Sequence, residues 1–458
     1  MKFGEYLSGL SDKRVTVIGA GISNKPLIEA LLAAGIDTTV SDKRTYDDLG
    51  ETSRRYESFG AKLRLGEGYL DELDADVIFR TPGLMPAHPT LVDAVKRGAV
   101  LTSEMEAFFS ICPCKIIAVT GSDGKTTTTS IIADLLEKQG FNVHIGGNIG
   151  RPLLCETETM GPADIVVLEL SSFQLITMKK SPHIAVYTNL SPNHLDIHAD
   201  MGEYTGAKRN IYIHQKSTDR LVINYDNANT RAEAEYAPGH VLFFSCAGKV
   251  AEGVYLDRGT IYNAFGGQSE AIINADEILI PGLHNVENFM AAFAAVSGLV
   301  DFDIMRDTAR AFRGVRHRIE LVREVRGVKY YNDSIASSPS RTNAGLRAFD
   351  RKVILIAGGK DKGVPFDSLG NEIIARVKTL VLTGATAKLI YETVVKAEGY
   401  DGTPEIIIRD DFGDAVLAAA EVAEEGDVVL LSPACTSFDR FSNFEERGDT
   451  FRKIVEGM

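Results

Sequence analysis

The sequence predicts an α/β protein of three domains, and three observations lead to this prediction. Its 458 residues correspond to about three domains of ordinary size. Short apolar runs, typical of buried parallel strands, alternate with segments of helical period along most of the chain. Two of these runs end in glycine-rich turns, as strands do in nucleotide-binding domains. We expect the domains to cover residues 1–105, 106–313 and 314–458.

The first domain is expected to be Rossmann-like. The run VTVIGAGIS predicts a strand and a glycine-rich turn, before an amphipathic helix and a second strand. Gly19 and Gly21 match the first two positions of G-x-G-x-x-G, but Asn24 stands where a dinucleotide fold prefers a small residue, which weakens the match to an NAD site. Asp42 ends the second strand with Arg44 beside it, so a ribose or a nucleotide phosphate is a candidate ligand. A scaffold that binds no nucleotide is the alternative.

The second domain opens with the most informative stretch, IIAVTGSDGKTTTTSI at 116–131. Gly121 and Gly124 let backbone N–H groups turn toward one point, and a helix starting near Lys125 adds its positive end. Lys125 would reach the β- and γ-phosphates of a nucleotide, and Thr126 would hold Mg²⁺. The spacing T-G-x-x-G-K-T-T is shorter than the common G-x-x-x-x-G-K-[ST] loop. We therefore predict a P-loop ATPase domain with a mostly parallel sheet.

Polar residues after the later strands of this domain are further candidates. Glu169 ends the run DIVVLE, where it is either a second Mg²⁺ ligand or a solvated acid. His194 and His198 have the spacing of a zinc protease, but Leu195 stands where the general-base glutamate would be. His194 is therefore a second-metal ligand or structural. Lys208, by its surroundings alone, is typical of an exposed helix lysine.

The start of an alanine-rich helix and the third domain supply the remaining candidates. Asn285 and Asn288 would either cap that helix or bind a purine edge. Arg318 follows the linker to the third domain and could clamp a phosphate. The third domain is expected to be Rossmann-like α/β, and its strand ends carry hydroxyls, lysines and backbone amides that could surround a small carboxylate.

Composition excludes several classes of protein. The formal charge of -14, from 49 basic and 63 acidic residues, argues against nucleic acid or an anionic membrane as a partner. No apolar run approaches the roughly 20 residues that span a bilayer, and the N-terminus lacks the apolar core of a signal peptide. The five scattered cysteines indicate a reduced, cytoplasmic protein. An NAD-dependent oxidoreductase and a regulatory nucleotide-binding module remain rival hypotheses, but neither explains all three domains.

Several motifs together resemble the Mur ligases, a family of amide ligases of peptidoglycan synthesis. These motifs are GNIG at 147–150, ELSSFQL at 169–175, GLHNVEN at 282–288, His317-Arg318, NDS at 332–334 and SPACTSFDRFSNFEERG at 432–448. The last motif is similar to that of the members which add D-glutamate. The resemblance implies a cytoplasmic monomer that joins D-glutamate to UDP-N-acetylmuramoyl-L-alanine through an acyl phosphate and releases ADP and phosphate. A sibling Mur-type or folylpolyglutamate-type ligase is the nearer alternative.

The resemblance also implies roles for matching positions, with ATP and two Mg²⁺ ions as cofactors. ATP would be bound by Gly121, Ser122, Asp123, Gly124, Lys125, Thr126, Thr127, Asn285, Asn288, Arg318 and Asp333. The metal ligands would be Thr126, Glu169, His194 and Lys208, the last as a carbamate, and Lys125, Glu169, His194 and Lys208 would be catalytic. The sugar nucleotide would be bound by Ile22, Ser23, Asp42, Arg44, Gly83 and Asn148. D-Glutamate would be bound by Ser337, Lys362, Ser437 and Phe444.

Two positions depart from the family pattern. Ile335 stands where a lysine is common, so that the contact of this lysine is missing or is supplied by Lys360 or Lys362. Asn193 precedes His194 where an acid is frequent, which leaves the expected metal site less negative. Neither departure affects the expected reaction.

Overall fold

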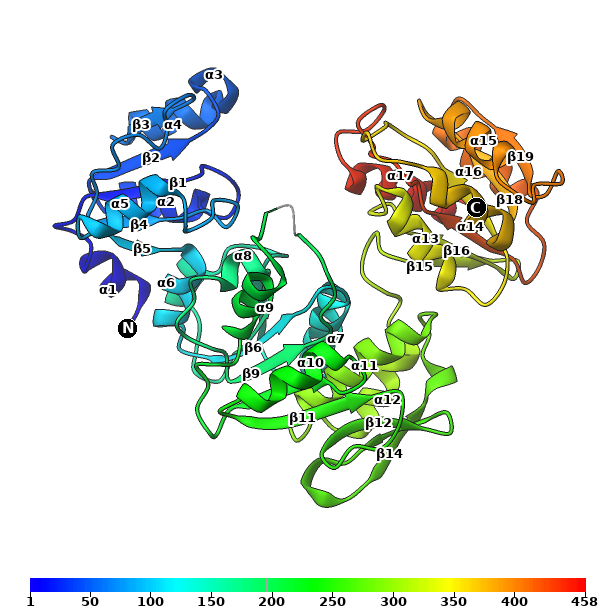
Figure 1. The fold of residues 1–458 in the computed structure, drawn as a ribbon, viewed down its shortest axis with the longest axis horizontal. Coiled ribbons are helices and arrows are strands. Elements are labelled where there is room, and N and C mark those ends of the chain that lie inside the picture. Colours follow the sequence, from blue (N-terminus) through cyan, green and yellow to red (C-terminus); the bar gives the residue numbers. More distant parts are fainter. Residues whose placement is uncertain (195–196) are drawn as a thin grey trace. The chain divides into compact units, whose positions relative to one another are not determined.

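The computed structural model describes residues 1–194 and 197–458. Within these residues the strands form three sheets, one after another along the chain, with helices between the strands (Figure 1). The α/β class with a parallel-rich sheet in each part is therefore confirmed. No helix in the described residues is both long enough and apolar enough to cross a membrane.

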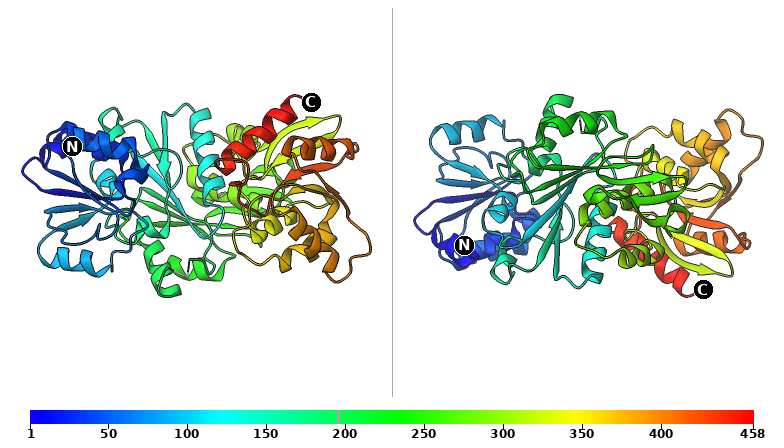
Figure 2. Two further views of the ribbon diagram at one scale, coloured as in Figure 1. Left: turned by 90° about the horizontal axis from the view of Figure 1, so that it is seen from above. Right: turned by 90° about the horizontal axis from the view of Figure 1, so that it is seen from below.

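The first sheet has five parallel strands in the order β3-β2-β1-β4-β5. Its central strand β1 is buried along its whole length, as expected where helices cover both faces. The views from above and below show these strands, in blue, between helices on both faces (Figure 2). The strands are β1 (Val15–Ile18), β2 (Thr38–Asp42), β3 (Lys62–Leu65), β4 (Val77–Phe79) and β5 (Val100–Thr102). The helices are α1 (Phe3–Ser8), α2 (Lys25–Ala33), α3 (Tyr46–Leu49), α4 (Glu51–Ser58), α5 (Pro89–Lys96) and α6 (Glu104–Ile111).

The second sheet has nine strands in the order β14-β13-β12-β11-β10-β9-β6-β8-β7. It is parallel from β7 to β12, and β12 and β13 then form an antiparallel pair that the sequence prediction did not include. The strands are β6 (Lys115–Thr120), β7 (Val143–Gly147), β8 (Ile165–Glu169), β9 (Ile184–Tyr187), β10 (Arg220–Asn224), β11 (His240–Ser245), β12 (Gly253–Asp257), β13 (Thr260–Asn263) and β14 (Glu270–Asn274). The helices are α7 (Lys125–Lys138), α8 (Ser172–Leu175), α9 (Met201–Arg209), α10 (Ala228–Glu233), α11 (Leu283–Val296) and α12 (Phe302–Ala311).

The third sheet has six strands in the order β15-β16-β20-β17-β18-β19. Only the edge pair of β15 and β16 is antiparallel among the described pairings of this sheet. The strands are β15 (Glu320–Val325), β16 (Val328–Asn332), β17 (Val353–Ala357), β18 (Val377–Leu382), β19 (Glu405–Ile408) and β20 (Val428–Leu431). The helices are α13 (Pro339–Arg347), α14 (Asp367–Arg376), α15 (Ala387–Lys396), α16 (Phe412–Glu421) and α17 (Phe444–Glu456).

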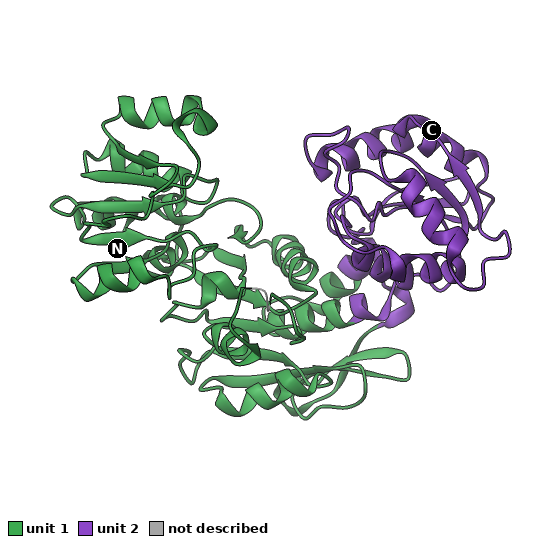
Figure 3. Ribbon diagram, turned by 45° about the horizontal axis from the view of Figure 1, so that its top comes forward, with its two compact units in different colours: residues 1–273, 287–306 green, residues 274–286, 307–458 purple. Residues whose placement is uncertain are grey.

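The chain divides into two compact units (Figure 3). The first unit comprises residues 1–273 and 287–306, and therefore holds both the first sheet and nearly all of the second. The second unit comprises residues 274–286 and 307–458 and holds the third sheet. The core of the first unit is continuous across its two sheets, since Val17 and Phe108 belong to the same buried cluster as Ala118 and Leu168.

Candidate active site

The loop after β6 has the geometry that the sequence predicts for a phosphate site. Gly121 and Gly124 both have positive φ, of 155° and 78°, and helix α7 begins directly afterwards at Lys125. A Cβ on Gly121 would collide with the side chain of Thr188, so this position requires glycine. The result is a tight turn in front of the N-terminus of a 14-residue helix, where backbone N–H groups and the helix dipole favour an anion.

The side chains of the loop add positive charge at the same place. Lys125 Nζ folds back over the loop and donates to the carbonyls of Gly121, at 3.0 Å, and Ser122, at 2.9 Å. Asn288 also faces the loop, because its Oδ1 accepts from Thr128 Oγ1 at 3.2 Å and lies where a Cβ on Gly124 would point. The turned backbone, the lysine and the open helix end fit a nucleotide polyphosphate.

Glu169 brings together three strand ends of the second sheet. It ends β8, which lies between β6 and β7, and its side chain is buried. One carboxylate oxygen accepts from Thr126 Oγ1 at 2.6 Å, and the other accepts from Asn148 Nδ2 at 2.7 Å. A hydroxyl and a carboxylate at this distance, beside a phosphate loop, are the oxygen ligands that Mg²⁺ prefers. The residues therefore fit a Mg²⁺–nucleotide complex.

Lys208 is not the surface lysine that its neighbours in the sequence predict. It lies on the inner face of α9 with only 2% of its surface exposed, and Nζ donates to the carbonyl of Gly121 at 2.8 Å and to Thr120 Oγ1 at 3.3 Å. Burial, together with the positive charge of Lys125, holds its pKa well below the usual value. A buried neutral amine under the phosphate loop can act as a nucleophile toward CO₂, which an ammonium cannot.

The two histidines have different surroundings. His198 is buried, with Nε2 at 2.9 Å from Ser172 Oγ and Nδ1 at 3.2 Å from Glu203 Oε2, and its ring is stacked on Phe173. It therefore ties α8 to α9. His194 is exposed and has a φ of 55°. Its ring lies edge-on to that of Phe173, and the ring centres are 5.2 Å apart. Leu195, on which the argument against a zinc protease rested, lies outside the described residues.

The predicted sugar-nucleotide residues of the first domain gather at one edge of the first sheet. Ile22, Ser23 and Gly83 are exposed in the loops after β1 and β4, and Arg44 follows β2. These three strands are neighbours, so their carboxyl ends share an edge, where ligands of parallel sheets bind. The sixth predicted residue, Asn148, lies instead at the second sheet on Glu169.

Asp42 shapes this edge from within. Its carboxylate accepts from the backbone N of Ala20 at 2.7 Å and pairs in two-pronged fashion with Arg44. Although burial alone would raise its pKa, the hydrogen bonds from Arg44 and Ala20 lower it to about 2. Asn24, the departure from the dinucleotide fingerprint, is buried and donates to the carbonyls of Ile18 and Gly19. It braces the glycine-rich turn.

In the second unit, the predicted D-glutamate residues follow three neighbouring strands. Ser337 comes after β16, Lys362 after β17 and Ser437 after β20. The loops of the last two are joined, because the backbones of Lys360 and Thr436 exchange hydrogen bonds of 2.8 and 3.1 Å. Phe444 begins α17 and lies edge-on to His317 at 6.0 Å. The structure therefore places Lys362, exposed, on a loop beside Ser437.

Arg447 is a further functional candidate, which lies within the motif at 432–448 but is not among the predicted site residues. Its guanidinium, 2% exposed, donates to the carbonyls of Ser334, Cys435 and Thr436 and to Ser334 Oγ. It thus fastens the Ser337 loop to the Ser437 loop. Burial lowers its pKa to about 10.

The remaining predicted nucleotide contacts also lie in the second unit. Asn285 is inside α11, which begins at Leu283, so the capping alternative is wrong; its Nδ2 donates to the carbonyl of Pro281 at 2.6 Å. Asp333 is buried and accepts from Ser432 Oγ at 2.8 Å. Burial raises its pKa to about 7, although Ser432 and the charge of Arg318 act in the opposite direction.

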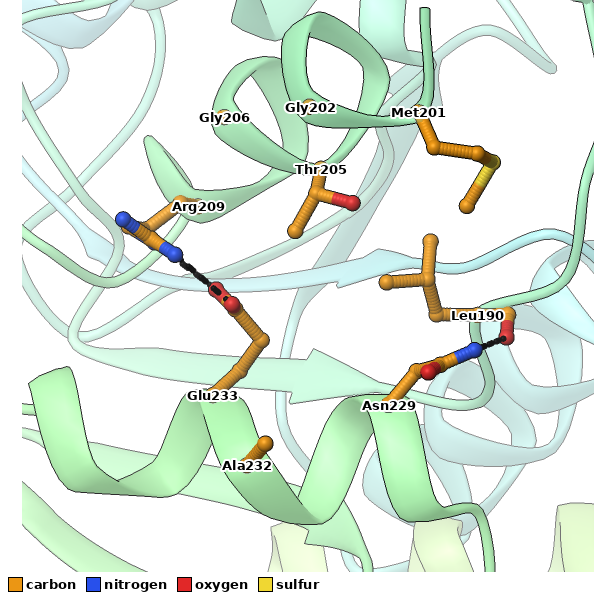
Figure 4. Close-up of a pocket in the computed structure, with 9 residues that line it drawn as sticks. All are labelled: Leu190, Met201, Gly202, Thr205, Gly206, Arg209, Asn229, Ala232 and Glu233. Atoms are coloured by element: carbon orange, nitrogen blue, oxygen red, sulfur yellow. Dashed lines mark hydrogen bonds and ion pairs between the residues drawn. The ribbon is translucent and has the colours of Figure 1, made fainter.

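A cavity of about 400 Å³ lies on the outer face of α9, between this helix and α10 (Figure 4). The ion pair of Arg209 and Glu233 closes one end and the hydrogen bond from Asn229 to the carbonyl of Leu190 closes the other. None of the predicted site residues is among the described residues that line it. Lys208, the catalytic candidate on α9, is not among these lining residues; its Nζ contacts the phosphate loop instead.

Comparison with known proteins agrees with this arrangement. Residues 119–296 match the family model of the Mur ligase middle domain, and residues 317–435 match that of the Mur ligase glutamate ligase domain. The chain belongs to the Mur ligase family. It is 50% identical over 462 residues to the UDP-N-acetylmuramoylalanine–D-glutamate ligase of Acetivibrio thermocellus, with 100% of this chain and 99% of the relative covered. It is 48% identical over 461 residues to the protein of the same name from Ruminiclostridium cellulolyticum, with the same coverage.

Solved structures of Mur ligases share the fold. A UDP-N-acetylmuramate-alanine ligase from Thermotoga maritima is 17% identical, with a TM-score of 0.58 over 97% of this chain and 99% of that one. The MurF ligase of the same organism, determined in complex with ADP, is 19% identical, with a TM-score of 0.57 over 98% and 97%. Membership of this ligase family replaces the oxidoreductase and regulatory-module hypotheses.

The raised pKa of Asp333 predicts a pH dependence of stability. Between the unfolded value of about 4 and the folded value of about 7, the folded Mur ligase binds one more proton than the unfolded chain, so stability falls as the pH rises. Asp333→Asn should remove this component. Its melting temperature relative to the wild type should therefore increase from about pH 5 to about pH 7 and then level off. The exposed Asp350→Asn is the control, and a difference that does not change with pH would contradict the assignment.

Proposed function

We propose that this Mur ligase joins D-glutamate to UDP-N-acetylmuramoyl-L-alanine at the expense of ATP. The observation that carries the proposal is the meeting of the phosphate loop, Glu169 and the buried Lys208 at one sheet edge. It occurs in a chain that is about half identical, over its full length, to proteins named for this reaction. The reaction belongs to the cytoplasm, where UDP-linked precursors are made, and one chain supplies all the proposed residues, which is consistent with a monomer.

In this proposal each of the three predicted domains binds a different substrate. Residues 1–105 would hold the uridine diphosphate with Ile22, Ser23, Asp42, Arg44 and Gly83. Residues 106–313 would hold ATP on the loop from Gly121 to Thr127, and Asn148 would contact the sugar nucleotide. Residues 314–458 would bind D-glutamate with Ser337, Lys362, Ser437 and Phe444, while Arg318 and Asp333 would join Asn285 and Asn288 at the nucleotide.

The first chemical step needs charge stabilisation at the transferring phosphoryl group. A carboxylate oxygen of the L-alanyl group forms a bond to the γ-phosphorus, the bond to the β-phosphate oxygen breaks, and ADP leaves. Lys125 is the mobile cation that would follow the γ-phosphoryl oxygens, and the loop N–H groups hold the phosphates in line. Two Mg²⁺ ions, when bound, would neutralise charge on these oxygens, with Thr126, Glu169, His194 and carbamylated Lys208 as their protein ligands.

The second step forms the amide. The amine of D-glutamate attacks the carbonyl carbon of the acyl phosphate to give a tetrahedral intermediate. Its carbon–oxygen bond to phosphate then breaks, and the departing phosphate takes up the proton that the amine loses. The protein contributes mainly position, because aligned groups reach effective molarities of about 10⁵ M or more. Exclusion of water would protect the acyl phosphate from hydrolysis.

The direct test is an assay of phosphate release. The purified protein with ATP, Mg²⁺ and UDP-N-acetylmuramoyl-L-alanine should release phosphate with D-glutamate, and not with L-glutamate, L-alanine or a diamino acid. Lys125→Ala should lose activity by about two orders of magnitude or more while it remains folded, since it removes the cation at the transferring group. Faster release with another amino acid, or with a folate and L-glutamate, would assign the chain to a sibling ligase.

The carbamate on Lys208 can be tested by chemical rescue. Lys208→Ala should be nearly inactive, and small carboxylates such as acetate or formate should restore part of the activity, because they refill the place of the metal ligand. The melting temperature is measured alongside, because the alanine leaves a cavity and removes a donor to the Gly121 carbonyl. The exposed Lys216→Ala is the control. Full activity of Lys208→Ala, or an unmodified amine in the intact mass and crystal structure of active enzyme, would refute the carbamate.

The proposed pocket for D-glutamate predicts that a substitution there changes the KM for D-glutamate but not the KM for ATP. A buried carboxylate needs a cation or several N–H donors, and Lys362 is the proposed partner of the side-chain carboxylate. Lys362→Ala should raise the KM for D-glutamate by about one to two orders of magnitude, or about 1.4 to 3 kcal/mol, with the KM for ATP nearly unchanged. Lys360→Ala, two residues away on the same loop, is the matched control. The reverse result would transfer the role to Lys360, and equal losses for both substrates would place Lys362 at the nucleotide.

A further inference from the structure

Arg80 is a buried arginine that the roles above do not use. It follows β4, and only 1% of its surface is exposed. Its Nη1 donates to the carbonyls of Thr81 at 3.3 Å, Pro82 at 3.1 Å and Leu84 at 2.9 Å. One end of the guanidinium is therefore wrapped by the loop that carries Gly83, at the substrate edge of the first sheet.

The other end of the same guanidinium contacts the segment after β8, a strand of the second sheet. Nη2 donates to the carbonyl of Phe173, in α8, at 2.9 Å and to Thr177 Oγ1 at 3.2 Å. Thr177 Oγ1 in turn donates to Glu106 Oε2 at 3.0 Å. Arg80 thus connects the loop 81–84 to the segment that directly follows Glu169 on β8.

This arrangement is costly if its purpose is stability alone. In the described residues no carboxylate lies within ion-pair distance of Arg80, and its Nε has no hydrogen-bond partner. Burial accordingly lowers its pKa, and the charge of Glu106 acts in the opposite direction. An apolar side chain would fill the space without the loss of hydration. An arginine, however, has a rigid planar guanidinium that can bind carbonyls of two separate elements at once and so fix the position of one element relative to the other.

The segment that Arg80 holds is part of the proposed catalytic edge. Phe173 lies four residues after Glu169, stacks on His198 and contacts His194 edge-on. His198 bonds Ser172 and Glu203, and so reaches the first turn of α9, the helix of Lys208. A displacement of α8 would therefore move the surroundings of two proposed metal ligands, Glu169, which precedes this helix, and His194, which contacts Phe173.

We propose that Arg80 is a positioning residue for the sugar-nucleotide substrate. It sets the loop 81–84, which would hold the uridine diphosphate end, against α8, beside which the L-alanyl carboxylate must meet the nucleotide phosphate. The distance between the two ends of the substrate's binding site then depends on one guanidinium. This inference rests on the proposed ligase function, since it needs a substrate that spans both sheets.

The test compares Arg80→Lys, Thr177→Val and a control variant by steady-state kinetics and thermal melting, and adds a chemical rescue of Arg80→Ala. Arg80→Lys keeps the charge but loses the fork. Thr177→Val removes the hydroxyl that accepts from Arg80 and donates to Glu106, whose Oε2 keeps its hydrogen bond from Ser103. For Arg80→Lys we expect kcat/KM for UDP-N-acetylmuramoyl-L-alanine to fall by about tenfold or more, with the KM for ATP changed by less than about twofold. Thr177→Val should also lower kcat/KM for UDP-N-acetylmuramoyl-L-alanine and leave the KM for ATP nearly unchanged, but by a smaller factor. Arg220→Lys is the matched control, because Arg220 is a half-buried arginine of the same unit that bonds the carbonyl of Ser297 and covers Phe265.

A structural role and a positioning role give different results. Arg220→Lys should lower the melting temperature without a split between the substrates, and Arg80→Ala should regain activity with guanidinium chloride but not with sodium chloride at equal ionic strength. Equal losses for both substrates in the Arg80 and Thr177 variants, or no kinetic change in either, would overturn the proposal. If the wild type released no phosphate with D-glutamate, the proposed function itself would fail, independently of the variants.

Discussion

The carboxylate of Glu169 is the interaction on which the rest of the site depends. It is buried at the end of β8 and accepts hydrogen bonds from Thr126, on the helix after β6, and from Asn148, after β7. Both of its oxygens are therefore engaged with the two neighbouring strands. Because parallel strands end at a common edge of the sheet, the loops after β6 and β7 lie side by side there, and this contact fixes the phosphate loop relative to the loop 147–150. Gly147 makes the approach possible, since a Cβ there would collide with the carbonyl of Glu169.

Buried lysine and arginine side chains are a recurrent feature of this chain, and three of them hold loops at a strand end. Lys208 lies under the phosphate loop, Arg447 joins two loops of the third sheet, and Arg80 joins a loop of the first sheet to α8. In each case backbone carbonyls are among the acceptors, so the polar head is held by dipoles and not by a counterion. Such groups are expensive to bury and contribute little net stability. Their value lies in holding loops that carry no secondary structure of their own.

The sequence predicted the fold class, the phosphate loop and the strand ends, because these depend on local patterns. The apolar runs of β6, β8 and β17 and the positive-φ glycines at 121 and 124 are visible without tertiary context. Burial of a charged residue is not. By its sequence Lys208 is typical of an exposed lysine. Tyr204, one helical turn earlier in α9, is nevertheless buried, so the buried stripe of the helix passes through Lys208. Arg447 shares its stripe with Phe451 and Val455 in the same way. The antiparallel edge pairs were missed because the direction in which two strands pair is set by tertiary packing, and the local pattern does not record it; β15 and β16 have six and five residues, no fewer than β8 and β17.

The departure at Ile335 shows how the surroundings of a site can differ from its motif. The backbone N of Ile335 donates to the carbonyl of His317, so the loop is held in place without a lysine side chain. Its carbonyl accepts from the guanidinium of Arg341, at 3.3 Å, on the first turn of α13. The charge of Arg341 also acts on the buried Asp333 two residues earlier. A cation therefore stands beside this loop, although it comes from the following helix and not from the motif. The charge at a binding site comes from all the loops and helices around it. A sequence motif describes only the residues of one of these loops.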